Sequence, residues 1–160
     1  MLVQRYEANP EAILTRKGGK FVCIPVKNIG TIKRIEIMER GEGGVIHKIQ
    51  VAGTKRLIEI STEYNIRALL NMEGEILTRS DGSKVKGGSL LPSAYFAIMP
   101  LYEKEELVGY KLEGGGYGHG AGMSQNGANQ MAKQGKTWEE ILKAFYTDVE
   151  LSDLADYSAI

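Results

Sequence analysis

A glycine-rich run at residues 114–128, reading GGGYGHGAGMSQNGA, constrains the fold more than any other stretch of the chain. It holds six of the chain's 20 glycines within nine residues, and one of its two histidines. Glycine loses more backbone entropy on folding than any other residue, so this density predicts positive φ angles or a close approach of another group to the backbone. A strand-like stretch at 107–112 precedes the run, which we therefore expect to connect a strand to a helix.

The rest of the chain predicts an α+β fold, in which antiparallel hairpins form a meander, with a barrel-like closure as an option, and about three helices pack on it. Strands are expected at residues 20–26, 31–38, 45–51, 55–60, 75–79, 84–86, 94–99, 107–112 and 149–151. Within 45–51, alternation places Val45, His47, Ile49 and Val51 on one face. Helices are expected over 63–71, from Ser124 to Gly135, and after Thr137, which forms a capping box with Glu140. A short helix from Glu11 fits the N-terminal residues.

Composition predicts one domain over residues 1–151, followed by a surface tail at 152–160, because 42% hydrophobic and 25% charged residues are ordinary for a globular protein. The 20 basic and 20 acidic side chains cancel, which argues against nucleic acid as a partner. No signal peptide and no membrane segment are expected, since no long apolar stretch occurs. The one cysteine, Cys23, is interpreted as a small core residue on a strand.

Several familiar motifs nearly fit the glycine run, and each fails on its context. The dinucleotide pattern at 116–121 lacks a following parallel strand, and Gly135-Lys136-Thr137 lacks the first glycine of a phosphate-binding loop. A nucleophile elbow at 122–127 has its second glycine one position late. The two histidines lie 72 positions apart, so we expect no bound metal, and no cofactor is expected.

Two interpretations of the run remain from the residues alone. In one, the glycines only let a strand pass closely under a helix, with Ser124 as N-cap and His119 as a hydrogen-bonded spacer. In the other, Tyr117 and His119 alternate with glycines and project from an unshielded backbone beside a helix N-terminus, which makes a surface for a polar ligand. The residues favour the second interpretation without naming the ligand.

The pattern Gly-x-Gly-His-Gly-x-Gly-Met-Ser-Gln-x-Gly-Ala at 116–128 resembles the signature of the SpoIID/LytB family, as do Met131-Ala132, Ile141-Leu142 and Phe145-Tyr146 after it. The stretches 90–98 and 32–70 are similar to the preceding parts of that family. The resemblance implies peptidoglycan glycan strands as substrate, lytic transglycosylase chemistry, a role in sporulation with other cell-wall enzymes, and a location outside the cytoplasmic membrane. By the same resemblance, the candidate catalytic residues are His119, Ser124 and Gln125. The candidate substrate-binding residues are Tyr117, Gly116, Gly118, Gly120 and Gly122.

The chain departs from the family in its first 30 residues. The family's catalytic glutamate lies in a segment resembling Leu-Pro-x-Glu-x-Tyr-Val, which is missing here, as are the upstream Cys and His that bind zinc in some members. The chain therefore resembles the C-terminal part of the family's domain, and Glu113 and Glu42 are the acids to inspect as substitutes. Three hypotheses follow: a glycan-recognising part of a transglycosylase, a non-catalytic wall-binding or scaffolding module, or a fragment whose groove the missing N-terminal half fills.

Overall fold

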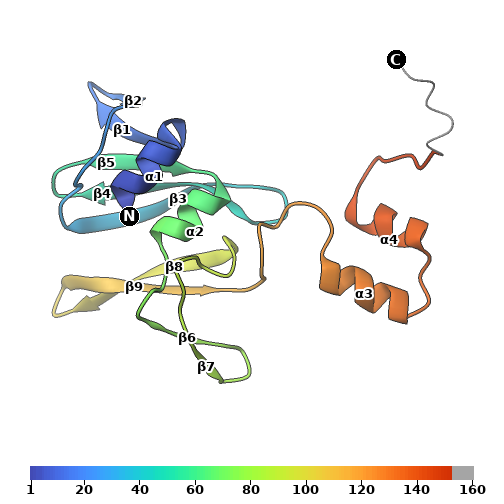
Figure 1. Cartoon of the computed structure of the whole chain (residues 1–160). Coiled ribbons are helices and arrows are strands. Elements are labelled where there is room, and N and C mark those ends of the chain that lie inside the picture. Colours follow the sequence, from blue (N-terminus) through green and yellow to red (C-terminus); the bar gives the residue numbers. More distant parts are fainter. Residues whose placement is uncertain (153–160) are drawn as a thin grey trace, which may run out of the picture. The chain divides into compact units, whose positions relative to one another are not determined.

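The computed structural model of the chain describes residues 1–152 and has an α+β fold (Figure 1). The chain divides into two compact units, Met1–Gly120 and the part that begins at Ala121. The prediction of a single domain over 1–151 stays a prediction, and most of the expected tail, residues 153–160, lies outside the described residues. No helix among residues 1–152 has both the length and the apolar character needed to cross a membrane.

The first unit is built around an antiparallel sheet of five strands. The strands are β1 (Ile13–Lys17), β2 (Lys20–Val22), β3 (Ile32–Arg40), β4 (Ile46–Gly53) and β5 (Leu57–Ser61). They lie in the order β2-β1-β5-β4-β3, so the expected meander is confirmed as β3-β4-β5 and the sheet remains open. The strand β1, which pairs with both β2 and β5, was not predicted.

The alternation expected in β4 is wrong at its start. Ile46 is fully buried and His47 is exposed, whereas Ile49 and Val51 are buried as predicted. The cause is a β-bulge, because Glu39 pairs with Lys48 while the next residue of β3 pairs with Ile46. The extra residue turns the side chains that precede it to the opposite face.

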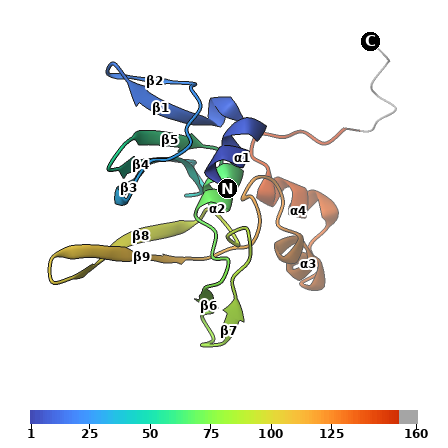
Figure 2. The same cartoon turned by 60° about the vertical axis from the view of Figure 1, so that its left-hand side comes forward.

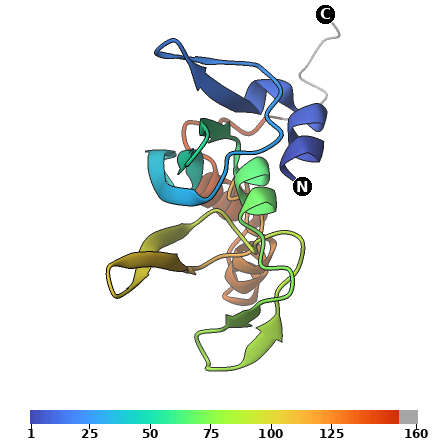
Figure 3. The ribbon, with the colours of Figure 1, turned by 90° about the vertical axis from the view of Figure 1, so that its left-hand side faces the viewer.

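Two short helices cover one side of this sheet and lie next to each other (Figure 3). They are α1 (Leu2–Ala8) and α2 (Glu63–Leu69), and a single 3₁₀ turn (Pro10–Ala12) follows α1. The helix over 63–71 is confirmed, although it ends earlier, while α1 was not predicted. The helix expected from Glu11 is reduced to the 3₁₀ turn, and β1 begins at Ile13. Isoleucines dominate the core beneath them, namely Ile13, Ile46, Ile49, Ile58, Ile60 and Ile66.

Cys23 was expected as a core residue on a strand, and this expectation is wrong. Cys23 is exposed and follows the end of β2, with its Sγ 3.6 Å from the Tyr6 hydroxyl oxygen. The strand ends at Val22, where the Ile24 amide turns back to the Val22 carbonyl (3.1 Å), and Pro25 beyond it has no backbone N–H with which to resume the ladder.

Two further hairpins complete the first unit. The pair β6 (Ile76–Thr78) and β7 (Lys84–Lys86) extends away from the five-stranded sheet (Figure 2). The pair β8 (Phe96–Glu103) and β9 (Glu106–Gly114) is longer, and its strands are joined through Lys104 and Glu105, both with positive φ. Because β9 ends at Gly114, the glycine run begins where this hairpin ends.

The second unit contains the helices α3 (Gln125–Lys133) and α4 (Trp138–Phe145), as expected. The capping box of Thr137 and Glu140 is present at the start of α4. The short strand expected at 149–151 is wrong, because these residues are irregular. A stretch of three residues without a neighbouring strand has no partner for its backbone groups.

The capping box predicts a pH-dependent signal. Glu140 Oε1 accepts a hydrogen bond from Lys136 Nζ (2.8 Å) and Oε2 accepts one from the Thr137 amide (2.9 Å), which lower the pKa of Glu140 below its ordinary 4.5. A lowered pKa means that the cap stabilises α4 above pH 4.5 and is lost as the pH falls through the folded-state value. We expect the Thr137 amide resonance to shift only below pH 4.5, and Glu140→Gln to abolish this transition. A transition that persists in E140Q would contradict the assignment.

Candidate functional site

The backbone of the glycine run needs glycine for two different reasons. Gly116, Gly118, Gly120 and Gly122 have φ angles of 81°, 113°, 76° and 77°, in the left-handed region that other residues rarely adopt. Gly114 has no positive φ, but a Cβ there would lie 2.1 Å from the Tyr95 carbonyl oxygen. The positive φ angles and the close approach that the glycine density predicts are both confirmed.

The loop before β8 is hydrogen-bonded to the beginning of the run. The Gly115 amide donates to the Tyr95 carbonyl (3.0 Å), and the Gly118 amide donates to the Pro92 carbonyl (2.8 Å). The Ser93 hydroxyl donates to the Gly115 carbonyl (2.5 Å) and accepts from the Tyr95 amide (3.1 Å). Three of these bonds fix the run as far as Gly118 against the loop, and the fourth, from the Tyr95 amide, orients the Ser93 hydroxyl within the loop.

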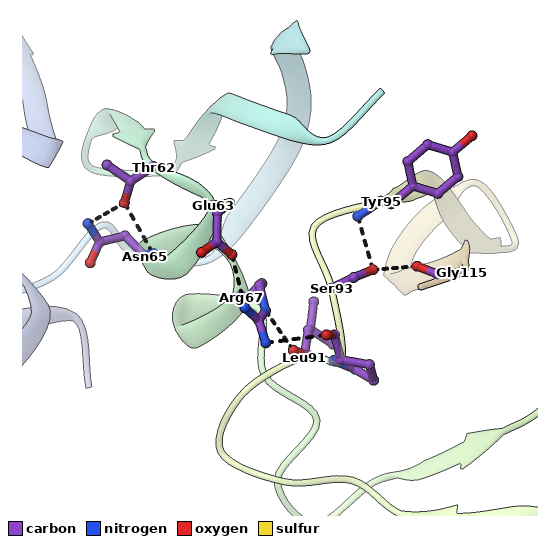
Figure 4. Close-up of polar contacts among 9 residues, drawn as sticks. Thr62, Glu63, Asn65, Arg67, Leu91, Ser93, Tyr95 and Gly115 are labelled. Carbon is purple, nitrogen blue, oxygen red and sulfur yellow. Dashed lines mark hydrogen bonds and ion pairs between the residues drawn. The ribbon is translucent and has the colours of Figure 1, made fainter. Parts of the chain in front are cut away.

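Arg67 of α2 holds this loop from the other side (Figure 4). Its Nε donates to the Leu91 carbonyl (2.8 Å), Nη2 donates to the Pro92 carbonyl (3.2 Å), and Nη1 pairs with Glu63 Oε2 (3.0 Å). Only 8% of Arg67 is exposed, so the charge is satisfied by the carboxylate and the two carbonyls rather than by water. The Pro92 carbonyl thus links α2 to Gly118.

Tyr117 and His119, the two side chains of the run in the first unit, are exposed to solvent. Tyr117 is 95% exposed and so packs against almost nothing, although the next residue, Gly118, is held by its bond to the Pro92 carbonyl. His119 is also exposed and lies between Gly118 and Gly120. A Cβ on Gly120 would meet Val45 Cγ2 at 2.4 Å, so the backbone next to His119 lies close to the sheet.

The end of the run belongs to the second unit. Ser124 is the N-cap of α3, where its Oγ accepts from the Gly127 amide (3.1 Å), as the sequence predicts. Gln125 is the first residue of α3 and is exposed. The Met123 amide donates to the Tyr146 hydroxyl (3.2 Å), which ties the residues before α3 to the end of α4.

The candidate site residues are therefore divided between the two units. The first unit contains Gly116, Tyr117, Gly118, His119 and Gly120, and the second contains Gly122, Ser124 and Gln125. Their assignments as catalytic or substrate-binding residues stay predictions. Among residues 1–152, no group of three or more His, Cys, Asp or Glu side chains has the arrangement of a metal site.

An open pocket of about 340 Å³ lies in the first unit where β9 meets the run. It is lined by Arg40, Gly44, Tyr95, Phe96, Ala97, Glu113 and Gly114. Sequence reasoning missed the roles of both arginines, Arg40 and Arg67. The sequence did offer a signal for Arg67, because it is the one charged residue among the apolar residues at 66–70. Arg40 lies at the charged end of a strand, so nothing in the sequence distinguished it from its neighbours.

Comparisons with known proteins found one family of domains that matches most of the chain, and shorter matches to bacterial proteins. The family described as "Domain of unknown function (DUF8618)" matches residues 11–122. "Stage II sporulation protein D" of Bacillus subtilis (strain 168) is 55% identical over 38 residues, which are 24% of this chain and 11% of that protein. "Amidase enhancer" of the same strain is 36% identical over 66 residues, 41% of this chain and 9% of that protein.

A longer match joins the chain to an uncharacterized protein of Brachyspira hyodysenteriae (strain ATCC 49526 / WA1), 34% identical over 111 residues, 68% of this chain and 28% of that protein. By contrast, the parts of the two Bacillus proteins that match this chain are each only about a tenth of those proteins' length. These partial matches indicate a SpoIID/LytB-like relationship. No solved structure matches the chain.

Proposed function

We propose that this chain, which belongs to the DUF8618 family, binds glycan strands of peptidoglycan, as the recognising part of a SpoIID-like lytic transglycosylase. The proposal rests on the relationship to "Stage II sporulation protein D" and "Amidase enhancer" together with the geometry of the run. It places the chain outside the cytoplasmic membrane, in cell-wall remodelling or sporulation.

The observation that carries the proposal is the exposure of Tyr117. A fold gains little from a side chain that is 95% exposed, so its ring is available to another molecule. Tyrosine offers an apolar ring face and a polar hydroxyl, and a sugar ring likewise combines a face of C–H groups with hydroxyls. The glycines beside Tyr117 have no side chains that would cover the ring, and His119 adds a second polar group.

The surroundings of the acidic residues near the run favour recognition of glycan over catalysis. A carboxyl that protonates a glycosidic oxygen needs apolar, poorly solvated surroundings. Glu113 is exposed and ion-paired with Lys111 (3.1 Å), and Glu42 is exposed in the turn before β4. The second candidate function, a wall-binding or scaffolding module without chemistry, draws on the same observation, and release of anhydro-muropeptides from sacculi by the purified chain would exclude it.

Co-sedimentation with purified sacculi tests the proposal. We expect Tyr117→Ala to lower the affinity about tenfold, because an aromatic ring at a binding surface contributes about 1.4 kcal/mol. We expect His119→Ala to lower it as well. The matched control is Tyr102→Ala, since Tyr102 is also exposed (62%) but lies near the tip of the β8–β9 hairpin. Equal binding by wild type, Y117A and H119A would refute the site, and no pelleting of wild type would refute the function.

A further inference from the structure

The pocket beside the run has a charged wall, formed by Arg40, whose charge no carboxylate in the described part of the chain neutralises. Arg40 Nη1 donates to the Gly44 carbonyl (2.7 Å) and Nη2 donates to the Phe96 carbonyl (2.8 Å). Both partners are neutral, and no carboxylate among residues 1–152 lies within ion-pair distance of Arg40. The two bonds hold the guanidinium in place, so a ligand does not have to order it.

The second wall is the ring of Tyr95, which is half exposed. A Cβ on Gly44 would lie 2.6 Å from Tyr95 Cε2, so the ring rests against the backbone of Gly44, whose carbonyl also binds Arg40. The Tyr95 amide donates to the Ser93 hydroxyl (Figure 4). The Tyr95 carbonyl accepts from the Gly115 amide, so the backbone of Tyr95 is fixed on both sides. A fixed aromatic ring and a fixed cation thus line one pocket.

The third wall carries Glu113, whose carboxylate is already paired with Lys111 Nζ (3.1 Å). This pair is close to neutral as a unit, which leaves the charge of Arg40 uncompensated in the pocket. A guanidinium whose Nη groups donate to neutral carbonyls keeps its positive charge and still attracts an anion, and a carboxylate matches its planar arrangement of donors.

We propose that this pocket is a carboxylate-binding site, in which Arg40 attracts the carboxylate and Tyr95 contacts the sugar or peptide group that bears it. The proposal rests on the proposed function, since it assigns to the glycan-binding chain a second site that selects carboxylate-bearing units. The carboxylate has two sources in peptidoglycan: the lactyl group of a muramic sugar and the acidic groups of the stem peptide. The site is separate from Tyr117, which does not line the pocket.

Amide-resolved NMR titrations of the full chain test the proposal with three probes: N-acetylmuramic acid, N-acetylglucosamine, which lacks the carboxylate, and the dipeptide alanyl-glutamate. We expect N-acetylmuramic acid to bind at least about tenfold more tightly than N-acetylglucosamine at low salt, with shifts at Gly44, Phe96 and Gly114. The preference should shrink at high salt because the pocket is open to solvent. The dipeptide identifies the source: binding tighter than that of N-acetylmuramic acid assigns the carboxylate to the peptide, and binding that is no tighter assigns it to the sugar.

Arg40→Gln is expected to abolish the preference, whereas Arg34→Gln, on the same strand and exposed in a pair with Glu36, should keep it. Tyr95→Leu keeps the charge and should weaken both sugars equally, which tests the pocket if R40Q does not fold. Equal affinity for the two sugars, or shifts confined to other residues, would overturn the proposal. If the chain binds sacculi but does not prefer N-acetylmuramic acid, the carboxylate site is refuted and the proposed function stands. If it prefers N-acetylmuramic acid but does not bind sacculi, the proposed function is refuted and the carboxylate site stands.

Discussion

Replacing Arg67 by methionine is expected to lower the free energy of unfolding by about 3–5 kcal/mol. Methionine fills similar space, but it leaves the carboxylate of Glu63 and the carbonyl of Leu91 without their donor, and it removes one of the two donors to the Pro92 carbonyl. The arginine side chain there is only 10% exposed and the glutamate 19%. Urea denaturation of the full chain, followed by circular dichroism, measures the change. Since domains are stable by about 5–15 kcal/mol, the shift in midpoint is easily measured.

The control for this substitution is Arg34→Met. Arg34 also forms an ion pair, with Glu36 at 3.0 Å, but its side chain is 62% exposed, so its loss should cost less than about 1 kcal/mol. Arg67→Lys tests geometry, because one ammonium group cannot replace the three separate contacts of the guanidinium, and we expect most of the loss to remain. An Arg67→Met variant as stable as R34M would show that α2 does not hold the loop.

The contacts of Arg67 show which part of the site could not be predicted from the sequence. The two carbonyl groups that Arg67 binds lie 24 and 25 positions further along the chain. Every residue has a backbone carbonyl, so the sequence gives no indication of which ones an arginine will bind. The helix α2 itself was predictable, since its apolar spacing and its cap at Thr62 are local signals. The amphipathic pattern thus located the helix but gave no information about its buried charge.

Local signals also explain which elements were found. The helices α3 and α4 were predicted because Ser124 and Thr137 are caps whose partners lie three residues away. The strand β1 was missed because a five-residue segment next to Pro10 carries little pattern, and its place is set by pairing with β5, more than 40 positions later. The bulge at His47 depends on β3 in the same way, so an alternation read from β4 alone assigned the wrong face there.

Replacing Gly114 by alanine is expected to cost about 2–3 kcal/mol of folding free energy. The new Cβ would lie 2.1 Å from the Tyr95 carbonyl oxygen and 2.6 Å from Phe96 Cα, and these backbone atoms cannot rotate away as the end of a side chain can. The strands must separate where Phe96 pairs with Gly114, which also weakens the bond from the Gly115 amide to Tyr95. Urea midpoints measure the cost, and amide hydrogen exchange at Gly115 reports the lost bond.

Gly115 provides the matched control, one position further along the same run. A Cβ on Gly115 meets no atom within 4 Å, and its φ is not positive, so alanine fits there without strain. Because alanine reduces the entropy of the unfolded chain, Gly115→Ala should be neutral or stabilise the fold by up to about 1 kcal/mol. Opposite signs for neighbouring glycines would establish that close packing, and not flexibility, requires Gly114. A similar loss in both variants would instead mean that the run needs conformational freedom throughout.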